Sequence, residues 1–123
     1  MYSVEAAKTN LEMVKGDDWY LDIGFETSAG VAVDITDWTV WLTLKRVQED
    51  TDANAAYQQK VTAHVDAVNG LSRVSIPAAS STLLLGKYYF DVQVKTDESP
   101  TPGIYTMIIG SFNVLQDITR GTT

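Results

Sequence analysis

Residues 74–94 read Val-Ser-Ile-Pro-Ala-Ala-Ser-Ser-Thr-Leu-Leu-Leu-Gly-Lys-Tyr-Tyr-Phe-Asp-Val-Gln-Val, and this stretch decides the fold. After its glycine, every second residue is large and apolar, namely Tyr88, Phe90, Val92 and Val94. A two-residue period is that of a β-strand with one buried face. We therefore predict that residues 87–95 form a central strand of a sheet.

The residues just before this strand have the chemistry of a tight corner. An inward-facing Tyr88 carries a hydroxyl group that needs a hydrogen-bond partner, and the preceding loop between Pro77 and Leu85 offers backbone groups. A tyrosine that sends its hydroxyl back to the preceding loop is typical of immunoglobulin-like sandwiches. We predict such a corner, with Gly86 at the bend and Tyr88 buried.

The rest of the chain is predicted to form short strands separated by turns. Alternating or continuous apolar residues predict strands at residues 9–14, 18–26, 38–47, 56–66, 72–76 and 104–115. A single helical turn is expected at 77–84, because proline is tolerated at a first helical position. The fold class expected for residues 1–123 is one all-β domain, an immunoglobulin-like antiparallel β-sandwich of about seven strands with one short helical turn.

The connections and the chain ends carry further expectations. Residues 67–70 end in Asn-Gly, which readily takes positive φ, so this turn is predicted to join the strands on either side of it as a hairpin. The acidic residues 48–56 have no periodicity and are expected to be the most mobile loop. The N-terminal arm, residues 1–8, and the C-terminal tail, residues 117–123, are expected to be ordered by contacts between chains.

Composition excludes several classes of partner. Sixteen acidic and nine basic side chains give the chain a net charge of −7, which repels phosphate backbones and anionic lipid surfaces. Cysteine is absent, so disulfides, thiolate metal sites and thiol nucleophiles are excluded. No basic start followed by an apolar run opens the chain, and no run of about 18 apolar residues occurs. We expect neither nucleic acid nor a membrane as partner, and no cleaved signal.

Few residues offer catalytic chemistry. His64 is the only histidine and is expected to be an exposed strand residue rather than a general base. Four nearby carboxylates fall in a turn or on a solvent face and are expected to be simply solvated: Asp17, Asp18, Asp22 and Glu26. We therefore expect no catalytic residue, and a chain that is not an enzyme.

Metal and nucleotide sites are also not expected. Residues 50–54 begin like a calcium loop, but Ala55 and Val61 stand where such a loop needs its glycine and its bidentate glutamate. The eight glycines form no phosphate-binding loop. The sequence thus predicts no metal and no cofactor.

Exposed rings suggest an interaction surface. Trp41 and Tyr89 fall on the solvent side of their strands, and an uninterrupted last strand would place Tyr105, Met107 and Ile109 beside them. A bulge near Gly110 would instead turn Met107 and Ile109 into the core. Such an apolar face predicts a protein interface, and Met107 and Ile109 favour this alternative. A row of exposed rings that binds sugars is the other alternative.

Four short motifs occur in order along nearly the whole chain. They are Lys-Gly-Asp-Asp at 15–18, Val-Asp-Ile-Thr-Asp-Trp-Thr-Val at 33–40, Leu-Gly-Lys-Tyr-Tyr-Phe-Asp-Val at 85–92, and Gly-Ser-Phe-Asn-Val at 110–114 with Asp-Ile-Thr-Arg at 117–120. This order resembles a group of small tailed-bacteriophage virion proteins, in particular the N-terminal immunoglobulin-like domain of baseplate upper proteins. The chain departs from the group at Asp37, where glycine is usual, and at Phe90, where a second tyrosine is usual.

The resemblance implies a non-enzymatic structural component of a tailed-phage virion. The implied place is the tail, the baseplate or a tail-fibre adaptor, and the implied mechanism is adhesion between subunits. Implied partners are other virion proteins, such as tail, baseplate, fibre or portal-proximal subunits, with several copies of the chain in each particle. A capsid decoration protein and a carbohydrate-binding module that contacts the host surface remain alternatives.

Overall fold

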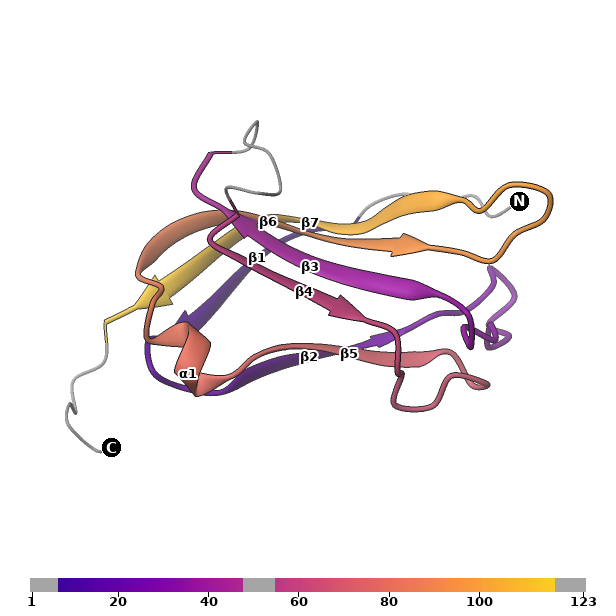
Figure 1. The fold of residues 1–123 in the computed structure, drawn as a ribbon, viewed down its shortest axis with the longest axis horizontal. Coiled ribbons are helices and arrows are strands. Elements are labelled where there is room, and N and C mark those ends of the chain that lie inside the picture. Colours follow the sequence, from indigo (N-terminus) through magenta and orange to yellow (C-terminus); the bar gives the residue numbers. More distant parts are fainter. Residues whose placement is uncertain (1–6, 48–54, 117–123) are drawn as a thin grey trace.

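The computed structural model describes residues 7–47 and 55–116, and within them seven strands and one short helix form two facing sheets (Figure 1). The elements are β1 (Ala7–Val14), β2 (Trp19–Gly24), β3 (Thr39–Lys45), β4 (Tyr57–Val61), β5 (Leu71–Ile76), α1 (Ala78–Ser81), β6 (Gly86–Lys95) and β7 (Ile104–Leu115). The larger sheet has the order β1-β7-β6-β3-β4, and the smaller sheet pairs β2 with β5. The predicted immunoglobulin-like sandwich is confirmed, with β6 at the centre of the larger sheet.

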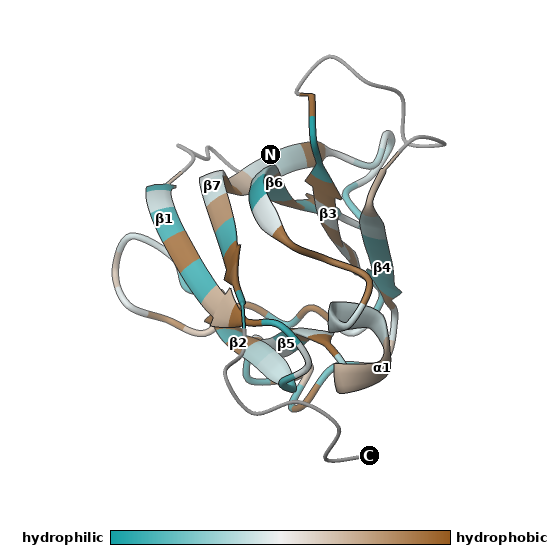
Figure 2. Ribbon diagram, turned by 90° about the vertical axis from the view of Figure 1, so that its left-hand side faces the viewer, coloured by the Kyte–Doolittle hydropathy of each residue, from teal (hydrophilic) through white to brown (hydrophobic). Residues whose placement is uncertain are grey.

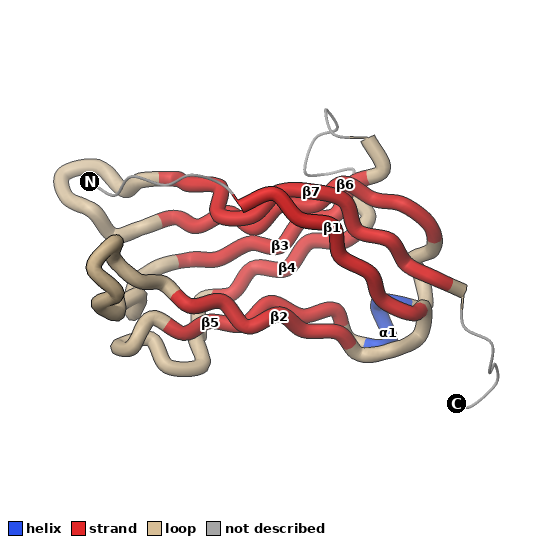
Figure 3. The backbone as a smooth tube through the Cα atoms, turned by 180° about the vertical axis from the view of Figure 1, so that it is seen from behind, coloured by secondary structure: helices blue, strands red, loops and turns tan. Residues whose placement is uncertain are grey.

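The first strand joins the larger sheet by a parallel pairing. All other strand pairs are antiparallel, whereas β1 runs parallel to β7, which lies beside it in the view from behind (Figure 3). Thr9 lies opposite Gly110 in this pair. A Cβ atom on Gly110 would lie 1.6 Å from the Thr9 carbonyl oxygen, so only glycine lets the two strands approach this closely. The pairing leaves β2 and β5 alone in the smaller sheet.

The core follows the two-residue period of β3 and β6. In β6 the side chains of Tyr88, Phe90, Val92 and Val94 are all at most 3% exposed. Phe112 on β7 joins the sheets, because its ring meets the Trp19 ring of β2 edge-on, with centroids 4.9 Å apart. Seen from one end, the larger sheet curves over β2 and β5 (Figure 2). Apolar side chains from both sheets fill the space between the layers.

The predicted corner is present. The Leu85 backbone N–H donates a hydrogen bond to the Tyr88 hydroxyl oxygen at 3.0 Å, and Tyr88 is buried. Gly86 takes a φ of +92°, which favours glycine. Arg46 completes the corner in a way that the sequence did not indicate. Its guanidinium carbon lies 4.1 Å from the Tyr88 ring centre, and the group donates hydrogen bonds to the carbonyl oxygens of Leu85 and Lys87.

The short helix α1 is fastened to the turn between β1 and β2. The buried Ser81 hydroxyl accepts a hydrogen bond from the Gly16 N–H at 3.0 Å and donates one to the Asp17 carbonyl oxygen at 2.8 Å. A carboxylate oxygen of Asp18 accepts a hydrogen bond from the Ala78 N–H at 2.7 Å. The expectation of simple solvation is therefore wrong for Asp18, whose carboxylate binds the first turn of α1.

Two local predictions need correction. The N-terminal arm is shorter than expected, because β1 already begins at Ala7. The predicted hairpin of residues 56–66 and 72–76 does not form, since β4 ends at Val61 and pairs with β3, whereas β5 pairs with β2. The turn at 67–70 thus carries the chain from one sheet to the other. Residues 1–6, 48–54 and 117–123 lie outside the described residues, and so do the expectations for the chain ends and for most of loop 48–56.

His64 also differs from its expected role. It lies in the connection after β4 and is half-buried rather than exposed on a strand. Its Nε2 atom lies 2.8 Å from the Trp38 carbonyl oxygen and its Nδ1 atom 2.8 Å from the Ser72 hydroxyl. The imidazole therefore links Trp38, the residue before β3, to Ser72 of β5.

Candidate functional site

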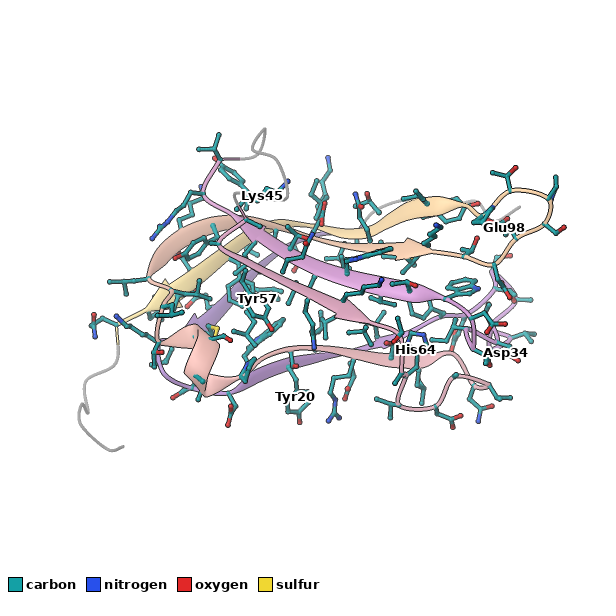
Figure 4. All side chains as sticks on the ribbon, viewed as in Figure 1. Tyr20, Asp34, Lys45, Tyr57, His64 and Glu98 are labelled. Carbon is teal, nitrogen blue, oxygen red and sulfur yellow. The ribbon has the colours of Figure 1, made fainter. Side chains whose placement is uncertain are left out.

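The outer face of the larger sheet, which points away from β2 and β5, is hollowed. Its groove has a volume of about 680 Å³ and is lined by Trp41, Thr43, Lys45, Gln58, Tyr89, Phe90, Asp91, Gln93, Ile104 and Ile109. These residues come from β3, β4, β6 and β7, and we refer to this site as the outer groove. Figure 4 labels Lys45 on this side of the sheet, whereas Tyr57 lies between the sheets.

Strand register orders the side chains of the outer groove into three rows. One row holds Lys60, Trp41, Gln93 and Thr106, the next Gln58, Thr43, Asp91 and Ile109, and the third Lys45, Tyr89 and Ser111. Successive rows are two residues apart, roughly 7 Å along the strands. The two large rings therefore lie on either side of a mostly polar row, about 13 Å apart along the strands.

Amide groups in these rows are held by threonines. The Gln58 Nε2 atom donates a hydrogen bond to the Thr43 hydroxyl at 3.1 Å, and the Gln93 Nε2 atom donates one to the Thr106 hydroxyl at 3.3 Å. Each contact joins neighbouring strands and fixes the amide against the sheet. Lys87 adds a cation beside Tyr89, with its Nζ atom 5.5 Å from the ring centre. The outer groove thus combines fixed polar groups with the half-buried ring of Trp41 and the exposed ring of Tyr89.

A bulge changes which residues of β7 reach this face. Val92 pairs with Ile108 but the next residue, Gln93, pairs with Thr106, so Met107 is extra. Met107 and Tyr105 consequently pack against the core, and the expectation that they lie on the outer face is wrong. The Tyr105 hydroxyl donates a hydrogen bond to Glu98 at 2.7 Å.

The outer groove keeps the other predicted residues and gains one. Trp41, Tyr89 and Ile109 line it, as the strand period predicted. Ile104 also lines it and is 67% exposed, although the sequence analysis did not single it out. The sequence at 104–109, Ile-Tyr-Thr-Met-Ile-Ile, does not alternate strictly between apolar and polar residues. This irregularity could have indicated a bulge, and with a bulge Ile104 falls on the outer face.

Titratable groups elsewhere have structural partners. The guanidinium of Arg73 donates a hydrogen bond to the Asp22 carboxylate at 2.6 Å, and this bond lowers the pKa of Asp22. Burial raises the pKa of Tyr57, whose hydroxyl donates to the Ser75 carbonyl oxygen at 2.8 Å. Within residues 7–47 and 55–116, no three histidine or carboxylate side chains gather as a metal site would require. No helix among these residues is long and apolar enough to cross a membrane.

Comparisons with known proteins give a likeness of fold. No protein-family model matches the chain, and no curated protein matches it in sequence. Among solved structures, the N-terminal domain of phage TP901-1 ORF48 is similar, with a TM-score of 0.50 and 12% identity over 90% of this chain and 85% of that one. AggA, the major subunit of aggregative adherence fimbriae type I from Escherichia coli, aligns at a TM-score of 0.33 and 12% identity, over 88% of this chain and 89% of that one. At this identity the likeness concerns the fold.

Proposed function

We propose that this chain is a non-enzymatic structural component of a tailed-phage virion, at the tail, the baseplate or a fibre attachment region. It acts by adhesion, and the outer groove is the surface that neighbouring virion proteins cover. The fold shared with a phage protein domain over most of both chains supports the phage context. The order of the four sequence motifs supports the same context independently.

The outer groove is the single observation that carries the adhesive role. Trp41, Tyr89, Ile104 and Ile109 place two rings and two aliphatic side chains in one hollow of a sheet face. Interface cores are enriched in aromatic residues and surrounded by a polar rim. The rows of amides, hydroxyls and lysines around these four residues form such a rim.

Purified particles from the strain that encodes this chain test the proposal. Mass spectrometry should detect the chain in the particles at a fixed ratio to the other virion proteins. The double variant Trp41→Ser and Ile109→Ser should keep its melting temperature and be lost from the particles. A matched control, Tyr20→Ser with Leu83→Ser, removes an exposed ring and an exposed aliphatic outside the groove and should be incorporated normally. Particles that never contain the chain overturn the virion proposal.

A second candidate function is the binding of an oligosaccharide in the same groove. It is favoured by the bulge, because Tyr105 and Met107 leave the face and Thr106 takes a place there beside Gln93. Sugars have apolar C–H faces and hydroxyl edges, which match rings flanking a row of amides and hydroxyls. A glycan array probed with the chain and with Trp41→Ser separates the two functions. Binding that Trp41→Ser abolishes supports the sugar site, and an array without signal rejects it.

A further inference from the structure

The charges of this chain are divided unevenly between its surfaces. Of its six lysines, five lie on the outer face of the larger sheet, at positions 8, 45, 60, 87 and 95, together with only two carboxylates, Glu12 and Asp91. Five positive and two negative charges give this face a formal charge of +3, in a chain whose net charge is −7. The lysines come from β1, β3, β4 and β6 and therefore surround the outer groove.

One end of the sandwich has the opposite charge. Three loops meet there, residues 25–38, 62–70 and 96–103, and we call this region the acidic end. They contain neither lysine nor arginine and six carboxylates, Glu26, Asp34, Asp37, Asp66, Asp97 and Glu98. Figure 4 labels Asp34 and Glu98 at this end of the molecule.

Neutral donors hold several of these carboxylates in place. The Trp38 Nε1–H donates a hydrogen bond to Asp97 at 2.9 Å, and the Asn69 side-chain amide donates one to Asp66 at 2.8 Å. Hydrogen bonds from the Thr36 hydroxyl and N–H lower the pKa of Asp34. The bonds from Thr36 favour the ionised form of the Asp34 carboxyl group.

The acidic end also presents apolar side chains. Val31, Val65 and Val68 lie in its loops and are 62, 61 and 66% exposed. Exposed aliphatic side chains among carboxylates are the counterpart of a groove that holds two rings and is surrounded by lysines. The two surfaces therefore complement each other in charge and in apolar character.

We propose that the outer groove takes the acidic end of a second copy of this chain. The proposal rests on the proposed function for the statement that the groove is an adhesive surface, and it names the partner. The valines of one copy lie against Trp41, Tyr89, Ile104 and Ile109 of the next copy. The lysines around the groove then face the carboxylates of the acidic end.

The contact joins two different surfaces, so it is a heterologous one. Each copy that uses its acidic end still offers its outer groove to a further copy, and repetition closes into a ring or continues as a row. Several copies side by side are what an adhesive component of a particle needs. The charge complementarity also predicts that salt weakens the contact.

Sedimentation velocity of the full chain over a range of concentrations gives the first test. The unaltered protein should self-associate at low salt, and association should weaken about tenfold or more at high salt. Two variants then change the charge of one surface each. The face variant is Lys60→Glu with Lys95→Glu, and the end variant is Glu26→Lys with Asp37→Lys. All four side chains are exposed and make no hydrogen bond or ion pair with the described residues, so each variant should keep its melting temperature.

Mixing the two variants is the decisive step. The face variant alone should be monomeric, because its outer face falls from +3 to −1 and then has the same sign as its acidic end, which carries −6. The end variant alone should associate much more weakly than the unaltered chain, because its acidic end is reduced from −6 to −2. The mixture should associate more strongly than either variant alone, since the native face of the end variant, at +3, meets the native end of the face variant, at −6. Both variants remain net negative, so overall charge attraction does not explain a rescue.

The outcomes separate this proposal from the proposed function. An unaltered chain that stays monomeric at low salt, or a mixture that stays monomeric, overturns the second copy as occupant. An end variant that associates like the unaltered chain points to face-to-face pairing and also overturns it. If the chain is monomeric and yet Trp41→Ser with Ile109→Ser is lost from particles, the groove takes a different virion protein, and the proposed function stands.

Discussion

The two faces of the larger sheet belong to the same strands and yet follow different rules. On the inner face, Phe90, Val92, Val94 and Phe112 are almost completely buried, and a strict two-residue period identifies most of them. The outer face mixes rings, amides, hydroxyls and lysines. The strict period holds along β6, whereas in β7 the bulge decides which residues face inward and which face outward. The difference teaches that the two-residue period of a sequence predicts core residues more reliably than the residues of a binding surface.

Truncating the inner face should have the largest effect. Phe112 is completely buried and its ring contacts Trp19 and Phe90, so Phe112→Ala should lower the free energy of unfolding by about 3–5 kcal/mol. Ile109→Ala, three residues earlier on the outer face, should change it by no more than about 0.5 kcal/mol. Urea denaturation of both variants measures the contrast. Equal losses would contradict the assignment of the two faces.

The bulge in β7 is tested by a smaller effect. Met107 packs against the core, so Met107→Ser should cost about 2 kcal/mol, at the lower end for a buried methionine because its burial is partial. Ile104→Ser is the matched control on the outer face and should leave the denaturation midpoint nearly unchanged. If Met107→Ser leaves the stability unchanged and Ile104→Ser lowers it, β7 has no bulge. Met107 would then lie on the outer face, as an uninterrupted strand predicts.

The bulge marks how far the sequence predicted the site. The central strand, the corner at Tyr88 and the short helix all follow from local patterns, and each is present. Tyr105 and Met107 were misplaced because one extra residue reverses the parity of everything before it in the strand. The parallel pairing of β1 with β7 is a contact between residues about a hundred positions apart, which no local pattern encodes.

The sequence also did not predict the polar contacts between distant segments. Arg46 at the corner and His64 between Trp38 and Ser72 have no local sequence signal, because their partners are chosen by the packing of the sheets. The outer groove was predicted only in part. Trp41 and Tyr89 were found from strand parity, but the charge difference between the outer face and the acidic end needed the strand order.

Removing the hydrogen bond of the Tyr88 corner should lower the free energy of unfolding by about 1 kcal/mol. Tyr88→Phe keeps the ring in place and removes the oxygen that accepts the Leu85 N–H hydrogen bond, so the loss is that of one unmade bond. Thermal or urea denaturation measures it, with Tyr89→Phe on the exposed neighbour as a control. An unchanged midpoint for Tyr88→Phe would reject the corner as a stabilising contact.

The smallest effect concerns an exposed ion pair on the smaller sheet. The hydrogen bond from Arg73 lowers the pKa of Asp22 in the folded state below its value in the unfolded chain. Its stabilisation is therefore present above the unfolded pKa and is lost as pH falls through the folded pKa. Asp22→Asn should be slightly less stable than the unaltered chain at neutral pH, and the difference should vanish in acid. Urea midpoints from neutral pH to about pH 2 test this, with Asp17→Asn as a control. A difference that grows in acid would contradict the direction of the pKa shift.

The most direct test of the outer face as the partner-binding surface is an electron cryomicroscopy map of an assembled particle that contains this chain. The account predicts that density of a neighbouring subunit covers Trp41, Tyr89, Ile104 and Ile109, while Tyr20 on the smaller sheet stays open to solvent. A map in which the outer groove is bare and the smaller sheet is covered would contradict it.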